Sequence, residues 1–120
     1  EVNPLMLIDS LQMSRSHHEE ILAACTKTTA EKIVITHGTD TMVETATFLA
    51  KESLQKTIVL TGAMVPYQFG SSDGLFNLGS SLAFVQTLPV GVYISMNGKY
   101  FSWNNVRKNT NMGEFEPLSE

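Results

Sequence analysis

Three residues of this chain carry side chains suited to hydrolytic chemistry: Thr39, Asp40 and Lys108. A threonine hydroxyl is a poor nucleophile until a base removes its proton, and a lysine can be that base when its surroundings favour the neutral amine. A carboxylate can orient the pair or hold a substrate ammonium group. Spacing alone does not bring Lys108 to Thr39, so a solvated basic loop remains an alternative for Lys108. An ordinary helix cap remains an alternative for Thr39 and Asp40.

The residues before Thr39 predict the element that positions it. The apolar, β-branched run from Lys32 to Thr36 is typical of a buried strand. A helical pattern begins after Asp40, where Thr41 and Glu44 have the spacing of a capping box. The hydroxyls and the carboxylate therefore lie where the carboxyl end of a strand meets the amino end of a helix. Open α/β sheets bind ligands at that edge, and the backbone N–H groups there favour an anion.

Helical and strand patterns alternate along the chain. The helical patterns cover residues 16–28, 41–53 and the segment from Leu75 to Val85, in which Leu75, Leu78, Leu82 and Val85 mark the apolar face. The strand patterns cover residues 6–8, 32–36, 57–63 and 90–96, and a hairpin at Asn97-Gly98 leads to a partner strand over 99–103. The pattern weakens after Asn104, and residues 114–120 are expected to be a frayed tail. Strands separated by such helices predict an α/β fold: an open three-layer sandwich with a mainly parallel, Rossmann-like sheet.

Composition narrows the function classes. The 120 residues make one domain, with a formal net charge of −4 and no basic cluster larger than Arg107-Lys108. This argues against nucleic acid or a membrane surface as partner, and no apolar run has the length of a membrane span. The only cysteine, Cys25, lies in a predicted helix and is expected to pack in the hydrophobic core. Because a single cysteine cannot form an internal disulfide, the reducing cytoplasm is the expected compartment. The first residues lack an initiator Met, so we expect the chain to begin inside a longer sequence.

Other polar residues have structural explanations. His37 is expected to be hydrogen-bonded at a strand end. His17 and His18 would point about 100° apart on a helix, which is poor geometry for a shared metal, so solvent exposure is expected for both. Ser72 and Asp73 precede the third helix, where capping is their first interpretation.

Several motifs in order resemble the bacterial L-asparaginase family, in its short single-domain form. They are His37–Met42, Thr61–Met64, Ser72–Leu78, Gly91–Gly98 and Asn105–Asn109. The resemblance implies an α/β fold and hydrolysis of a side-chain amide through an acyl-enzyme, without a metal or organic cofactor. The implied substrate is L-asparagine, with L-glutamine as an alternative, and a homo-oligomer is expected.

The resemblance also assigns roles to individual residues. Thr39 matches the second catalytic threonine of the family, and Asp40 matches the acid that contacts the substrate α-amino group. Lys108 matches the lysine that completes a proton-handling triad with them. Ser10 matches the serine that contacts the substrate carboxylate, and Gln12 matches a nearby polar contact.

One family feature does not occur in the 120 residues: the Thr-Gly-Gly-Thr loop, whose threonine is the attacking nucleophile, with the tyrosine loop that follows it. Loss of a nucleophile removes the covalent route. We therefore expect either an N-terminal segment upstream of residue 1 or a non-catalytic relic. The alternative function is a non-catalytic domain that binds a small amino acid or serves in assembly.

Overall fold

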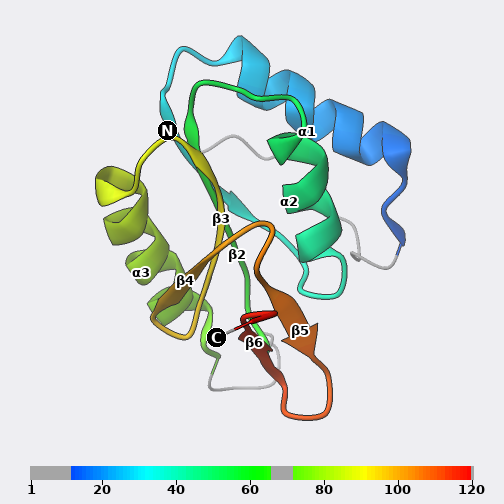
Figure 1. Cartoon of the computed structure of the whole chain (residues 1–120), viewed down its shortest axis with the longest axis vertical. Helices are drawn as coiled ribbons and strands as arrows, with labels where there is room; N and C mark the ends of the chain where they lie inside the picture. The colour runs from blue at the N-terminus through cyan, green and yellow to red at the C-terminus, as the bar shows by residue number, and fades with distance from the viewer. Residues whose placement is uncertain (1–11, 66–71, 120) are drawn as a thin grey trace.

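The computed structural model describes residues 12–65 and 72–119, and its centre is a four-stranded sheet (Figure 1). The strands are β1 (Lys32–Thr36), β2 (Thr57–Thr61), β3 (Gly91–Met96) and β4 (Lys99–Ser102), in the spatial order β1-β2-β3-β4. β1, β2 and β3 run parallel, and β4 pairs with β3 in the antiparallel sense. The predicted strands over 32–36, 57–63, 90–96 and 99–103 are confirmed, with some ends one or two residues shorter. The predicted strand at 6–8 lies outside the described residues.

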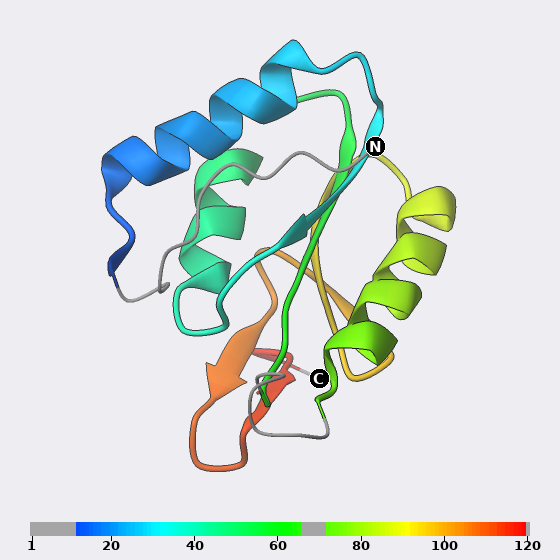
Figure 2. The ribbon, with the colours of Figure 1, turned by 180° about the vertical axis from the view of Figure 1, so that it is seen from behind.

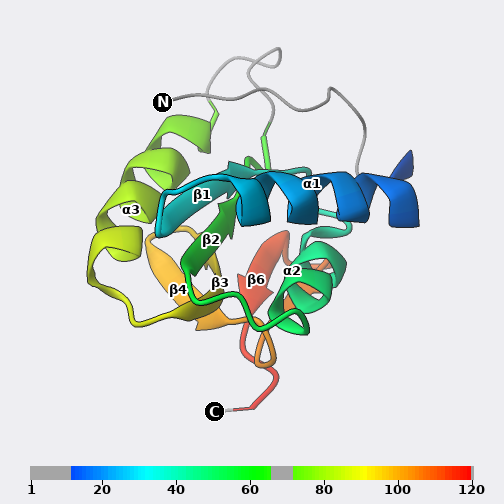
Figure 3. The same ribbon diagram turned by 90° about the horizontal axis from the view of Figure 1, so that it is seen from above.

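Helices cover both faces of the sheet. Figures 1 and 3 show α1 (Arg15–Lys27) and α2 (Met42–Ala50) on one face, and α3 (Gly74–Thr87) on the other. The two faces of β2 are completely buried, as continuous apolar strands of parallel sheets are. The predicted three-layer α/β fold is confirmed. No helix within residues 12–65 and 72–119 is both long and apolar enough to span a membrane.

The first helix begins earlier than predicted. It begins at Arg15 and not at residue 16, because a capping box forms between the N-cap Ser14 and His17, whose Nδ1 accepts from the Ser14 N–H at 2.9 Å. The expectation that both histidines are solvent-exposed is also wrong, since His17 caps the helix and the His18 ring packs 5.4 Å from the Phe48 ring. Cys25 is buried, as predicted.

The buried face of α3 agrees with the predicted one only in part, at Val85. The helix buries Asn77, Ser81 and Val85, whereas Leu75 and Leu82 are 69% and 49% exposed. Burial of the two polar residues is tolerated because both are hydrogen-bonded; the Ser81 hydroxyl donates to the Asn77 carbonyl at 2.6 Å. Apolar periodicity does not detect buried polar residues, so it identified Val85 correctly and missed Asn77 and Ser81.

The C-terminal segment is ordered instead of frayed. β5 (Arg107–Asn109) and β6 (Glu114–Glu116) pair as an antiparallel hairpin that is separate from the main sheet. Over the described residues 114–119 the predicted frayed tail is wrong, because Phe115 is buried in the hydrophobic core and this burial stabilises the second strand. The predicted turn at Asn97-Gly98 is confirmed, with positive φ angles of 56° and 77°.

Candidate active site

Lys108 lies against the turn that follows β1. Its Nζ donates to Thr39 Oγ1 at 2.8 Å and to Asp40 Oδ1 at 2.7 Å. The Lys108 side chain is only 16% exposed, and that of Asp40 is 43% exposed. Figures 1 and 2 both show the β5–β6 hairpin beside the turn that joins β1 to α2. The structure thus brings Lys108 to two neighbouring residues that lie 69 and 68 positions earlier in the chain.

His37 fixes the conformation of the turn just before Thr39. Its ring Nδ1 lies 2.6 Å from the Gly38 carbonyl oxygen, and its Nε2 lies 2.8 Å from the Thr45 hydroxyl. Because a carbonyl can only accept, Nδ1 carries the proton of the Gly38 hydrogen bond, and the Thr45 hydroxyl, which can donate or accept, holds Nε2. Burial lowers the His37 pKa, against the raising effect of the Gly38 hydrogen bond. The predicted hydrogen-bonded histidine at a strand end is confirmed.

The ends of β1 and β2 approach each other more closely than a side chain permits. A Cβ added to Gly62 would lie 2.2 Å from the His37 carbonyl oxygen. The His37 N–H donates to the Thr61 carbonyl at 2.8 Å across the same junction. Gly62 is therefore required for the close packing that supports the turn.

A second polar cluster, formed by Asp73 and Asn77, lies between the end of β2 and the start of α3. Asp73 accepts from the Met64 and Val65 N–H groups at 3.1 and 3.0 Å, and from Asn77 Nδ2 at 3.0 Å. Burial raises the pKa of Asp73, but these hydrogen bonds together hold it below its ordinary value.

Asn77 completes this second cluster. Its Nδ2 also donates to the Gly62 carbonyl at 2.8 Å, and its Oδ1 accepts from the Asn97 N–H at 2.9 Å. Asp73 occupies the N-cap position of α3, yet its side chain makes no capping hydrogen bond. The capping predicted for it is therefore wrong, because its carboxylate is engaged by the loop that follows β2. Sequence analysis gave Asn77 no role, and a polar residue within an apolar helical pattern was the available signal.

The remaining predicted residues lie at the start of the chain. Gln12 is exposed and precedes α1. Ser10 lies outside the described residues, so its predicted contact with a substrate carboxylate stays a prediction. Within the part of the chain that the structure describes, no group of three or more His, Cys, Asp or Glu side chains is arranged to hold a metal ion.

The fold and this cluster define the class of protein: an α/β domain with a threonine, an aspartate and a lysine joined at the carboxyl edge of a parallel sheet. Residues 1–116 match the family model described as Asparaginase, N-terminal. The chain belongs to the asparaginase family, as its motifs predicted.

Similarity to individual proteins agrees with this assignment. The chain is 41% identical over 90 residues to a glutaminase-asparaginase of Acinetobacter glutaminasificans, which covers 72% of this chain and 27% of that protein. It is 39% identical over 94 residues to L-asparaginase 2 of Escherichia coli, and this match covers 75% of this chain and 26% of that protein. The thermostable L-asparaginase from Thermococcus kodakarensis superposes with a TM-score of 0.88 at 28% identity, over 98% of this chain and 38% of that one. The chain thus spans about a quarter of the length of these curated relatives.

Proposed function

We propose that this domain forms part of an amidohydrolase that converts L-asparagine to L-aspartate and ammonia. The observation that carries the proposal is the position of Lys108, whose side chain is mostly buried and whose Nζ donates to Thr39 and Asp40. Membership of the asparaginase family and the printed names of its relatives support this substrate class, with L-glutamine as the alternative amide. The same proposal places Ser10 at the substrate carboxylate and Gln12 near it.

In this proposal the three residues divide the work. The Asp40 carboxylate binds the substrate ammonium group. Lys108 orients the carboxylate through Oδ1, and the side chain is 43% exposed, so a ligand can reach it. Thr39 and Lys108 transfer protons, because the Lys108 Nζ lies within hydrogen-bond distance of the Thr39 hydroxyl. The attacking hydroxyl adds to the side-chain carbonyl, ammonia leaves, and water hydrolyses the acyl-enzyme. A threonine of a Thr-Gly-Gly-Thr loop, absent from the 120 residues, supplies that hydroxyl.

Ammonia release from L-asparagine tests the proposal. The 120 residues alone should be nearly inactive, and a version extended at its N-terminus by a Thr-Gly-Gly-Thr segment should be active. In that version Thr39→Val and Lys108→Met should each lower kcat by roughly 100-fold or more, because a proton-transfer group typically contributes that much. Thr110→Val and Lys99→Met, at exposed positions of the two hairpins, are the matched controls.

Two outcomes would contradict this division of work. Robust turnover by the bare 120 residues would make Thr39 the nucleophile. Absence of turnover by the extended version would favour the alternative function, a non-catalytic domain that binds a small amino acid.

A further inference from the structure

Lys108 is presented to the site by a structure outside the main sheet. It is the central residue of β5, which among the described strands pairs only with β6, and each of the two has three residues. A two-stranded hairpin of this length is marginally stable without further contacts. The position of Lys108 therefore depends on what holds the hairpin in place.

The inner face of the hairpin is anchored by apolar burial. Lys108 pairs across the strands with Phe115, so the two side chains share one face. Phe115 and Val106 are 6% and 2% exposed and belong to the hydrophobic core. These apolar contacts hold one face of the hairpin against the core. The opposite face needs other groups to hold it.

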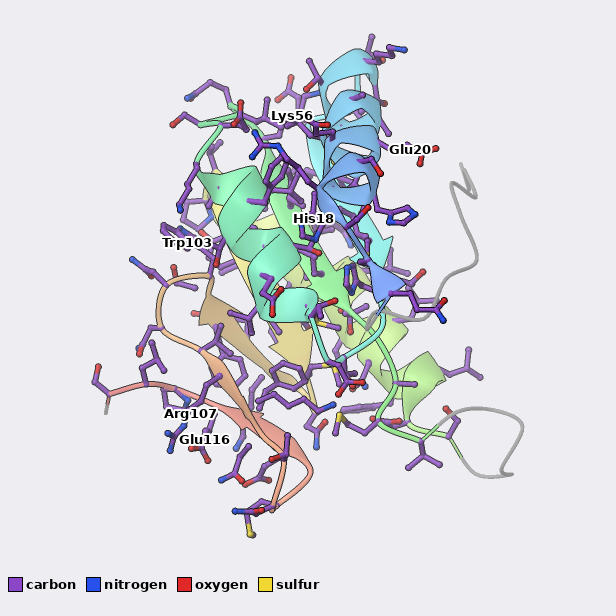
Figure 4. The ribbon with its side chains drawn as sticks, turned by 90° about the vertical axis from the view of Figure 1, so that its right-hand side faces the viewer. His18, Glu20, Lys56, Trp103, Arg107 and Glu116 are labelled. Atoms are coloured by element: carbon purple, nitrogen blue, oxygen red, sulfur yellow. The ribbon has the colours of Figure 1, made fainter. Side chains whose placement is uncertain are left out.

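The outer face is held by Glu116. Its Oε2 accepts from Arg107 Nε at 2.7 Å, and its Oε1 accepts from Asn109 Nδ2 at 3.0 Å. Figure 4 shows the Arg107 and Glu116 side chains close together on the hairpin. Arg107 and Asn109 are the two neighbours of Lys108 in the strand, so one carboxylate binds on both sides of it.

The same carboxylate is linked to the turn of the hairpin. Asn109 Oδ1 accepts from the N–H groups of Asn111 and Met112, both at 3.1 Å. Asn109 thus accepts hydrogen bonds from the turn through its side-chain oxygen and donates one to Glu116 through its side-chain NH₂ group. The hydrogen bonds from Asn109 and Arg107 lower the pKa of Glu116, because they favour the ionised carboxylate.

We propose that Glu116 is a positioning residue for Lys108: by binding Arg107 and Asn109 it holds the β5–β6 hairpin in the geometry that places Lys108 Nζ on Thr39 and Asp40. The inference rests on the proposed function for its importance to catalysis. The geometric part stands independently, because the position of Lys108 can be measured without any enzymatic activity.

Competitive acylation of lysine amines, read by peptide mass spectrometry across pH, tests the proposal on the 120-residue chain. Nζ of Lys108 is protected by its two hydrogen bonds and its burial, so its labelling follows the population of opened hairpin. Glu116→Ala should raise the labelling rate of Lys108 on the order of threefold or more, and Glu116→Gln should raise it less, since its amide oxygen still accepts from Asn109. Glu114→Gln, on the same strand and exposed, should leave the rate unchanged.

Two other lysines report on the rest of the fold. Lys99 is exposed and sets the reference rate. Lys56 Nζ donates to the carbonyls of Cys25 and Thr28, so it gains reactivity only when the domain opens. Selective labelling of Lys108, with Lys56 unchanged, supports the proposal. Unchanged labelling of Lys108 in Glu116→Ala would overturn it, as would a parallel rise at Lys56 in both Glu116 variants. Neither of those results would bear on whether asparagine is the substrate.

Discussion

Two polar clusters lie at the carboxyl edge of the same sheet, and they differ in how much of their hydrogen-bonding capacity the protein itself uses. In the Asp73–Asn77 cluster both carboxylate oxygens and both ends of the amide are engaged by loop and turn backbone, and Asn77 is fully buried. In the Thr39–Asp40–Lys108 cluster the carboxylate is bound on one oxygen by Lys108 and is 43% exposed. The first cluster is committed to holding the fold, and the second retains a charged group that a ligand can reach.

This contrast explains why residue type alone is a poor guide to function here. Asp40 and Asp73 both follow a strand and precede a helix. Their different roles come from the neighbouring chain: the Met64 and Val65 N–H groups turn toward Asp73, whereas a distant lysine reaches Asp40. The following changes test the contrast, in order of decreasing effect.

Gly62→Ala should disturb both clusters. The new Cβ would lie 2.2 Å from the His37 carbonyl oxygen, and Gly62 also accepts a hydrogen bond from Asn77. Because the obstructing atom is backbone, the two strand ends must separate, and we expect a loss of about 3 kcal/mol in unfolding free energy. Urea denaturation measures it. Gly79→Ala is the matched control: nothing lies within 4 Å of the added Cβ, so it should stabilise the helix by roughly 0.5–1 kcal/mol. Equal effects at the two glycines would contradict the close packing.

Asn77→Ala should affect only the structural cluster. It removes the side-chain partner of the Gly62 carbonyl and of the Asn97 N–H and one of the two donors to Asp73 Oδ2, at a cost of about 2–3 kcal/mol in the same assay. Asn111→Ala, on the exposed hairpin turn, should change stability by less than about 0.5 kcal/mol. A folded Asn77→Ala protein should bind L-aspartate as the wild type does; a selective loss of binding would mean that the clusters are not separate.

Asp73→Asn should cost about 1–2 kcal/mol at pH 7, since it weakens hydrogen bonds to a charged group. The folded-state pKa of Asp73 lies below its ordinary value of 3.8, so its contribution is fully present above that value. The contribution is lost as the pH falls through the folded-state pKa. The stability difference between the wild type and Asp73→Asn should therefore shrink below about pH 3.8, measured by urea midpoints across pH. A difference that is constant over this range would refute the role of the ionised form.

The strands and their order of succession could be predicted because β-branched runs such as Lys32–Thr36 carry a local signal. Three features depend on contacts that are distant in sequence, and local patterns do not encode them. The inner face of α3 is polar because Asn77 binds three segments. β6 is ordered because Phe115 reaches the core. Lys108 reaches Thr39 across 69 residues, and only the resemblance to a family predicted that pairing.

Isothermal titration of the 120-residue chain with L-aspartate tests most directly whether the exposed cluster is a ligand site. The account predicts that Asp40→Asn lowers the affinity by at least about tenfold, because a charge-assisted hydrogen bond to the ligand ammonium is lost. It also predicts that the unfolding free energy changes by less than about 1 kcal/mol, since the Asp40 side chain is 43% exposed and the Asn amide oxygen can still accept from Lys108 Nζ. Glu52→Gln, at an exposed acid beyond α2, is the control and should bind as the wild type does. Equal heats of binding for the wild type and Asp40→Asn, or no binding by either, would contradict the account.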